Sequence, residues 1–343
     1  MDAFYVAVEL LRRPELRGKP VIVAGRGPRA VVTTASYEAR RFGVGSAVPA
    51  VRARRLCPEG IFLPPDFSHY RAKSREVMAL VGGLGVPTEA VSLDEVYLDL
   101  YGLDYPVDEM SRLVRRIKAE LELEASVGIG PNKLVAKVAS DAEKPRGFVV
   151  LTREQAAERF ACEPAMLLPG IGPKTAERLR GLGASSIGEL QGLPVRRLQD
   201  SFGGRQGRYL HDRAHFRDHS DVAERETKSR SVEATFDRDL SELEAMERVL
   251  DGQSAELARS LRARGLRGRT ISIKVRLDDF TTVTRARTLA KATDDTPTIA
   301  EAARALIRAY DPPRPVRLLG VRAASFNDTR EPEPQAQALP LLR

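Results

Sequence analysis

Residues 91–100 have the sequence Val91-Ser92-Leu93-Asp94-Glu95-Val96-Tyr97-Leu98-Asp99-Leu100, an apolar run with two adjacent acids in its middle. The β-branched and aromatic residues predict a buried strand or hairpin. Burying unpaired carboxylates is costly, so Asp94 and Glu95 indicate either a metal site or a turn at the edge of a site. Adjacent carboxylates at a strand bend are able to share two Mg²⁺ ions, the arrangement used for phosphoryl transfer. A solvated hairpin tip is the alternative interpretation of this segment.

The composition indicates a globular protein with more than one domain. The chain has 343 residues, 42% of them hydrophobic, and this length allows several cores. No apolar run approaches the roughly 20 residues that span a bilayer, and the first turns lack the apolar segment of a signal peptide. Cys57 and Cys162 stand alone, so neither a zinc site nor a disulfide framework is indicated. These features predict a cytoplasmic protein.

Positive charge is concentrated in one part of the chain. The formal net charge is +8, and residues 262–291 hold nine basic residues against only Asp278 and Asp279. This segment therefore carries nearly all of the excess. A basic patch of this kind is typical of nucleic-acid binding, with an acidic protein partner or a membrane surface as the alternative.

The first half of the chain is expected to alternate helices with short strands, which predicts an α+β layer. Residues 1–11 predict the end of a strand that leads into a helix. The further expected elements are a strand at 20–24, a helix at 68–82, the acidic hairpin, a helix at 108–121, a strand at 125–129 and a helix at 132–142. Residues 152–222 predict helices with glycine-rich breaks, and the polar residues 224–229 predict an interdomain linker.

Residues 230–328 are expected to form a second unit in the order β-α-β-β-α-β. Between Ile271 and Leu277, apolar residues alternate with Ser272, Lys274 and Arg276, as in a half-buried strand. We expect one face of this sheet to build a core and the other to present cations. Arg285 and Arg287 are expected to repeat this outward alternation on the next strand. Such a basic face suits the phosphates of a nucleic-acid duplex.

Residues 168–176 form a glycine turn that leads into a helix. Gly170 and Gly172 allow the backbone to approach a phosphate, and the helix N-terminus beside Lys174 offers free N–H groups. The segment resembles a helix-hairpin-helix motif, which binds the DNA backbone without reading its sequence. An ordinary glycine-rich connection between helices is the alternative, and residues 202–208 suggest a second, weaker backbone contact.

Tyr37 and Arg40 are three residues apart in a segment of expected helix, so their side chains lie on one face and are able to reach the same ligand. An arginine suits forked contacts with phosphate. Taken alone, a tyrosine and an arginine at this spacing are more often surface residues than ligands, and Lys144 likewise fits any exposed lysine.

Several motifs occur together in the order seen in one family. They are residues 1–5, residues 34–44, Ser92-Leu93-Asp94-Glu95, residues 128–137, Lys144-Pro145 and the turn at residues 170–174. Over essentially its full length the chain resembles Y-family DNA polymerases of the bacterial polymerase IV (DinB) class.

The resemblance implies an α+β right-hand polymerase. The implied domains are a palm at 1–10 and 66–155, fingers at 11–65, a helix-hairpin-helix thumb at 156–222, a linker at 223–229, a little finger at 230–328 and a flexible tail at 329–343. The implied activity is error-prone translesion synthesis in DNA repair. It adds dNTPs to a primer 3′-OH under the direction of a template, with Mg²⁺ or Mn²⁺ as the metal and without proofreading. The implied protein is a monomer associated with the nucleoid.

The resemblance also implies roles for individual residues. Asp94 resembles the carboxylate that bridges two metal ions, Glu95 the one that serves the ion activating the primer 3′-OH, and Met1 belongs to the same metal-binding set. Tyr5 is at the position of a steric gate that excludes ribonucleotides, and Phe4 lies beside it. The implied triphosphate contacts are Thr34, Tyr37, Arg40 and Lys144. The implied DNA contacts are Gly170, Gly172, Lys174, Lys274, Arg276, Arg285 and Arg287.

One departure from the family concerns the metal ligands. The family's first strand carries an Asp immediately before the Met-Asp pair, a position that precedes Met1. We expect the natural protein to begin several residues earlier and this chain to bind metal weakly. Asp2 is poorly placed as a substitute, because successive strand side chains point to opposite faces.

Residues 337–342 resemble the peptide by which these polymerases bind the β-subunit sliding clamp, with Gln337, Leu339, Leu341 and Leu342 as anchors. Two other classes of protein remain as alternatives. One is a DNA-binding homologue that has lost catalysis, and the other is a nucleotide cyclase, which also uses paired acids on a palm. The basic sheet and the glycine turn disfavour a cyclase, because cyclization does not require a grip on duplex DNA.

Overall fold

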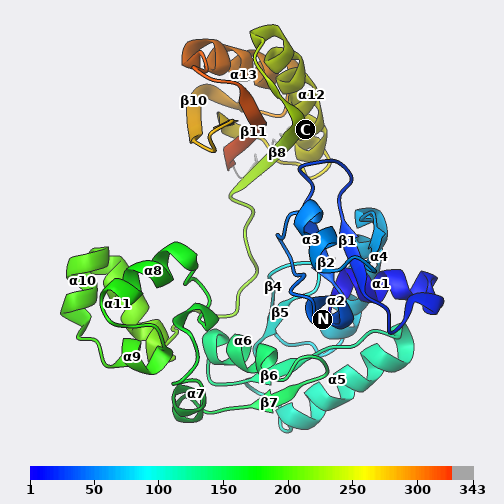
Figure 1. Ribbon diagram of the computed structural model, residues 1–343, viewed down its shortest axis with the longest axis vertical. Helices are drawn as coiled ribbons and strands as arrows, with labels where there is room; N and C mark the ends of the chain where they lie inside the picture. The colour runs from blue at the N-terminus through cyan, green and yellow to red at the C-terminus, as the bar shows by residue number, and fades with distance from the viewer. Residues whose placement is uncertain (327–343) are drawn as a thin grey trace, which may run out of the picture. The chain divides into compact units, whose positions relative to one another are not determined.

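The computed structural model describes residues 1–326, and the chain divides into two compact units (Figure 1). The first unit comprises residues 1–26 and 30–225, and the second comprises residues 27–29 and the chain from Glu226 onward. The boundary after Arg225 falls within the segment expected to be a linker. No helix in the described part of the chain is long and apolar enough to cross a membrane.

The first unit begins with a helix and a small sheet. Strand β1 pairs antiparallel with β2 and parallel with β3, and all four residues of β1 are buried, as its sequence Val-Ile-Val-Ala predicts. Helix α2 begins after Ser36, whose side chain accepts a hydrogen bond from the N–H of Ala39. The elements of this region are α1 (Phe4–Arg12), η1 (Pro14–Leu16), β1 (Val21–Ala24), β2 (Val32–Ala35), α2 (Tyr37–Arg40), α3 (Ala50–Leu56) and β3 (Ile61–Leu63).

Two short two-stranded sheets follow, and helices flank them. Strands β4 and β5 form an antiparallel hairpin, whereas β6 and β7 are parallel. The acidic segment thus forms a hairpin, and the expected helices and strand are present with small shifts at their ends. The elements are α4 (Phe67–Gly82), β4 (Thr88–Ala90), β5 (Val96–Leu98), α5 (Pro106–Leu121), β6 (Val127–Ile129), α6 (Lys133–Ala142) and β7 (Phe148–Val150).

Residues 153–214 are helical, as expected, and have a core of their own. Leu179, Ile187, Leu198 and Leu210 are fully buried in it. The elements are α7 (Arg153–Arg159), η2 (Ala165–Leu167), α8 (Pro173–Gly181), α9 (Ile187–Gln191), α10 (Val195–Phe202) and α11 (Gly204–Ala214).

The second unit has the predicted order β-α-β-β-α-β. Its antiparallel sheet has the strand order β10-β9-β11-β8, and helices α12 and α13 pack against it (Figure 1). The core lies between the helices and the face of β9 that carries Ile271, Ile273, Val275 and Leu277. The elements are β8 (Ser229–Leu240), α12 (Leu243–Arg262), β9 (Gly268–Leu277), β10 (Thr282–Thr293), α13 (Thr296–Tyr310) and β11 (Val316–Phe326).

The register of β9 and β10 corrects one expectation. Arg285 lies directly opposite Ile273, and Arg287 lies opposite Ile271. Directly opposed residues project from the same face of a sheet, so both arginines lie on the helix-covered side and not with Lys274 and Arg276. The guanidinium of Arg285 accordingly lies 5.0 Å from the centre of the Tyr310 ring of α13. The expectation was wrong because alternation along one strand does not determine its register against the next.

Candidate active site

The two acids lie at the end of the β4–β5 hairpin. The N–H of Val91 donates to the carbonyl of Glu95 at 2.9 Å, which closes the turn. Ser92 Oγ donates to Asp94 Oδ1 at 2.8 Å and accepts from the N–H of Asp94 at 3.2 Å. These contacts hold two half-buried carboxylates side by side at the edge of the small sheet.

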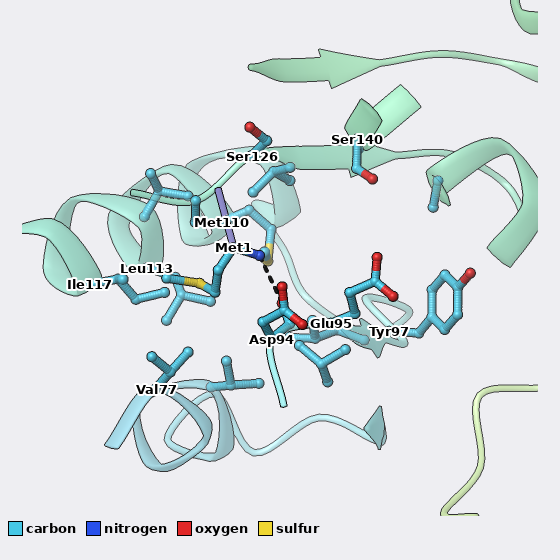
Figure 2. A pocket seen from close by; sticks show the side chains of 18 of the residues that line it. Met1, Val77, Asp94, Glu95, Tyr97, Met110, Leu113, Ile117, Ser126 and Ser140 are labelled. Carbon is cyan, nitrogen blue, oxygen red and sulfur yellow. Dashed lines mark hydrogen bonds between the residues drawn. The ribbon is translucent and has the colours of Figure 1, made fainter. Parts of the chain in front are cut away.

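A cavity of about 160 Å³ opens beside these acids, and Figure 2 shows the side chains that line it. Residues of β5 and of β6 both line it, so the cavity lies between the two small sheets. In residues 1–326 neither β5 nor β6 has a second strand partner. The α-amino group of Met1 lies at this cavity and donates to the carbonyl of Asp94 at 2.7 Å, the dashed line in Figure 2. Burial lowers the pKa of this amino group.

A second cavity, of about 230 Å³, collects the residues expected to contact a nucleotide. It is lined by Met1, Ala3, Phe4, Tyr5, Thr33, Thr34, Tyr37, Arg40, Ser46, Asp94 and Lys144. Four separate segments of the chain therefore bring hydroxyl groups, two cations and one of the paired acids to one place.

The aromatic and cationic side chains in this cavity are held by their neighbours. The Arg40 guanidinium lies 4.6 Å from the centre of the Tyr37 ring, and Arg40 Nε donates to the carbonyl of Ala35 at 3.0 Å. Burial raises the pKa of Tyr37, whose hydroxyl has no hydrogen-bond partner in the described residues. This hydroxyl is a buried polar group available to a ligand.

Tyr5 belongs to an aromatic cluster at the start of α1. Its ring stacks on Tyr70 with centroids 4.5 Å apart and meets the edge of Phe67 at 5.8 Å. These contacts limit the movement of the Tyr5 ring at the rim of the cavity. Phe4 lines the same cavity but is only 3% exposed, so most of its side chain belongs to the core.

Four alternating charges connect the acidic hairpin to Lys144. Lys137 Nζ lies 2.6 Å from Glu95 Oε1 and 3.0 Å from Asp141 Oδ2, and Lys144 Nζ lies 2.6 Å from Asp141 Oδ1. Although burial raises the pKa of Asp141, hydrogen bonds from Lys144 and Lys137 hold it below its usual value.

The described residues contain no group of three or more His, Cys, Asp or Glu side chains able to hold a metal ion. Asp94 and Glu95 supply hard oxygen donors of the type that Mg²⁺ prefers. Asp2 does not join them. It is 4% exposed, accepts from Ser126 Oγ at 2.8 Å and from the N–H of Arg146 at 2.8 Å, and so faces away from the acidic pair, as expected.

Comparisons with known proteins agree with this geometry. The impB/mucB/samB family model matches residues 1–141, and the model of its C-terminal domain matches residues 227–338. DNA polymerase IV of Streptomyces coelicolor is 42% identical over 98% of this chain and 72% of its own length. DNA polymerase IV of Methanoculleus marisnigri is 40% identical over 94% of this chain and 91% of its own length. The chain belongs to the Y family of DNA polymerases.

A solved Y-family DNA polymerase chimera supports the fold, with a TM-score of 0.85 at 23% identity over 95% of this chain and 97% of that chain. A model described as the DNA polymerase-iota thumb domain matches residues 166–215, so the expected helix-hairpin-helix region is confirmed at the level of fold. The expected Y-family membership and the right-hand fold class are likewise confirmed.

The glycine turn of this Y-family chain has the expected local geometry. Gly170 has φ +93°, and a Cβ there would lie 2.5 Å from Tyr209 Oη, so only glycine fits. Helix α8 begins after Gly172 without a side-chain cap, which leaves its first N–H groups available. Lys174 in the first turn is exposed.

The cations of the second unit differ in their surroundings. Lys274 Nζ lies 3.0 Å from both carboxylate oxygens of Glu233, and Arg276 Nε donates to Thr282 Oγ1 at 2.9 Å. Arg287 is exposed and, within residues 1–326, forms no ion pair. The clamp-like residues Gln337, Leu339, Leu341 and Leu342 lie outside the described residues.

Sequence reasoning assigned no role to Lys137, Asp141 or Asp2. Lys137 ends the motif at residues 128–137, and Asp141 lies one helical turn later, at the i,i+4 spacing that brings charges together. That spacing was an available signal for this pair. No sequence pattern indicated the hydrogen bond between Asp2 and the loop after α6, because the two segments are far apart in the sequence.

Proposed function

We propose that this chain is an error-prone translesion polymerase that adds dNTPs to a primer 3′-OH under the direction of a template and without proofreading. The observation that carries the proposal is the cavity that joins Tyr5, Arg40, Lys144 and Asp94. Cations alone would bind a triphosphate, whereas an adjacent carboxylate pair favours phosphoryl transfer. The family membership points in the same direction.

In this proposal the cations and hydroxyls of the second cavity bind the triphosphate. Arg40 and Lys144 offset its charge, and Thr34 and the unpaired hydroxyl of Tyr37 donate hydrogen bonds to its oxygens. Arg40 is already fixed by the Tyr37 ring and by the Ala35 carbonyl. Its side chain therefore loses little conformational entropy when the nucleotide binds.

Tyr5 is proposed as the steric gate. Its ring is held by Tyr70 and Phe67 and therefore does not yield easily to a ribose 2′-OH. Phe4 supports this position from the core side. Exclusion by a fixed ring discriminates between sugars without any hydrogen bond to them.

We propose that Asp94 and Glu95 hold Mg²⁺, together with the carbonyl oxygen of Met1, since Mg²⁺ prefers oxygen ligands over a thioether. The bound metal would activate the primer 3′-OH and neutralise charge on the departing pyrophosphate. Neither the choice between Mg²⁺ and Mn²⁺ nor the number of ions affects the roles of the protein residues described above.

A third carboxylate immediately before Met1 is part of the proposal. The cavity between β5 and β6 separates two strand edges that have no partner in the described residues, a geometry suited to an inserted extended segment. Met1 lies at this cavity beside Asp94, so the residue before it would reach the acidic pair.

The test is primer extension by this chain beside a version with an apolar strand and an aspartate added before Met1. Activity in the extended version alone would support the proposal. Equal activity in both would show that another acid completes the site. If neither version extends the primer but both bind primer–template DNA, the result would favour the homologue that binds DNA without catalysis. Absence of DNA binding would favour a cyclase.

We propose the palm, fingers, thumb and little finger at the boundaries given above, and contacts with primer–template DNA through Lys174 and the second unit. The proposed protein acts as a monomer at the nucleoid, and its tail binds the sliding clamp. The exposed first turn of α8 and the cations Lys274 and Arg276 of β9 support the DNA contacts.

A further inference from the structure

The charge chain that runs from Glu95 to Lys144 links the two halves of the proposed site. Its ends are a carboxylate of the acidic pair and a cation of the nucleotide cavity. Its inner members, Lys137 and Asp141, lie outside the nucleotide cavity. Asp141 uses one carboxylate oxygen for each lysine, so it has contacts on both sides.

We propose that Lys137 is a positioning residue that controls Lys144 through Asp141, so that the acidic hairpin and the triphosphate contact are set together. This inference rests on the proposed function and assigns a role to two residues that do not touch the nucleotide. Asp141 divides its charge between two lysines. When Lys137 pairs with one carboxylate oxygen of Asp141, Asp141 attracts Lys144 less strongly. Lys144 is then free to turn toward a triphosphate.

Helix α6, which carries the two inner charges, is fixed in place. Lys137 and Asp141 are one turn apart on α6, and Lys144 lies two residues beyond its end. A Cβ on Gly128 of β6 would lie 2.1 Å from the carbonyl oxygen of Ala136, so α6 and β6 are in direct backbone contact. Asn132 caps the helix by accepting from the N–H of Val135 at 2.9 Å. A rigid helix keeps the spacing of the charges constant.

The four groups are also shielded enough to affect one another. The side chains of Lys137, Asp141 and Lys144 are between 24% and 37% exposed, and that of Glu95 is 39% exposed. Partly buried charges are screened less by solvent and salt than fully exposed ones. An ordinary surface pair would contribute little, and its loss would not affect a ligand bound elsewhere.

The proposal predicts that the effect of Lys137 depends on Asp141. In Lys137→Met, Asp141 has Lys144 as its only partner and holds it away from the triphosphate, so dATP should bind about fivefold more weakly. In an Asp141→Asn background the same change should alter binding by less than about twofold. A direct effect of the Lys137 charge on the triphosphate would instead persist in both backgrounds.

The measurement is calorimetric titration of dATP into the full chain bound to primer–template DNA, which does not require turnover. Lys137→Arg should restore binding, because it retains the charge and reaches both carboxylates. Glu143→Gln is the matched control. It removes a neighbouring exposed carboxylate, whose partner is Arg159, and should leave dATP binding unchanged. Asp141→Ala provides a second neutral background if Asp141→Asn fails to fold.

The outcomes separate the two proposals. Failure of dATP to bind both the unmodified chain and the version with an aspartate added before Met1, while both bind DNA, would overturn the proposed function. Binding of dATP by the unmodified chain, with an equal effect of Lys137→Met in both backgrounds, would overturn the coupling through Asp141 alone. A loss of binding in Lys137→Met that disappears in Asp141→Asn would establish the coupling.

Discussion

Asp2 Oδ2 accepts a hydrogen bond of 2.8 Å from the backbone N–H of Arg146, so a residue two positions before α1 holds the loop that follows α6. The same carboxylate accepts from Ser126 Oγ, which in turn accepts from the N–H of Gly147. Lys144 lies in this loop. A single buried carboxylate therefore fixes the position of one proposed triphosphate contact without touching the nucleotide cavity itself.

Replacing Asp2 should destabilise the first unit. In Asp2→Ala the N–H of Arg146 and the hydroxyl of Ser126 lose their partner in a buried place, and the free energy of unfolding should fall by about 1–3 kcal/mol. Urea unfolding measures this change. Asp104→Ala removes an exposed carboxylate of the same unit and should change stability by less than about 0.5 kcal/mol. Equal losses in the two variants would contradict the role of Asp2.

Gly128 should tolerate no side chain. A Cβ at this position would lie 2.1 Å from the carbonyl oxygen of Ala136 and 2.3 Å from the backbone nitrogen of Ser140. Gly128→Ala must therefore push α6 away from β6, with an expected loss of about 3 kcal/mol or more. Gly82→Ala has open space and should be neutral or slightly stabilising. Thermal unfolding compares the two, and a stable Gly128→Ala would contradict the close packing of α6.

Glu89 should make stability depend on pH. It is 4% exposed and accepts from Lys133 Nζ and from Arg225 Nε, each at 2.7 Å. The bond from Lys133 lowers the pKa of Glu89 below 4.5 against the opposing effect of burial, and Arg225 lowers it further. A carboxyl with a lowered folded pKa stabilises the fold above its unfolded pKa and loses this contribution as the pH falls through the folded value.

Glu89→Gln should accordingly cost about 2–4 kcal/mol at neutral pH. This difference from the unmodified chain should shrink below about pH 4.5, the unfolded value. Urea unfolding at a series of pH values measures the difference. Glu76→Gln removes one partner of an exposed pair and should have little effect at any pH. A difference for Glu89→Gln that does not change with pH would refute the assignment.

Tyr5 should determine the choice of sugar. Tyr5→Ala removes the ring that Tyr70 and Phe67 hold in place, so the preference for dATP over ATP should fall by about tenfold or more. Binding of both nucleotides to the chain with primer–template DNA can be compared by calorimetry. Tyr5→Phe retains the ring and should keep the preference. If Tyr5→Ala discriminates as well as the unmodified chain, Tyr5 is not the gate.

Two cations of the second unit should differ in their contribution to DNA binding. Arg276 lies on the same face of β9 as Lys274 and forms no ion pair in the described residues, whereas Lys274 is neutralised by Glu233 at 3.0 Å. Arg276→Gln should lower the slope of log binding constant against log salt concentration by about one, and Lys274→Gln should lower it by much less. Fluorescence anisotropy of labelled primer–template DNA measures both slopes. A larger effect for Lys274→Gln would show that DNA displaces Glu233.

Much of the fold was predictable because its signals are local. The acidic hairpin, the helices near residues 68–82, 108–121 and 132–142, and the β-α-β-β-α-β order all follow from hydrophobic spacing and turn residues, and the structure contains each of them. The placement of Arg285 and Arg287 on the cation face failed, because register between strands depends on packing.

The sequence by itself determined the order of the elements, the family and the chemical types gathered for the site, since motifs and periodicity are carried by neighbouring residues. Only the tertiary structure decided which of these groups meet. It placed Lys137 between Glu95 and Asp141, Asp2 under the loop of Lys144, and the arginines of β10 on the helix-covered face. The full set of these contacts depends on the packing of whole helices and sheets, which no stretch of neighbouring residues determines.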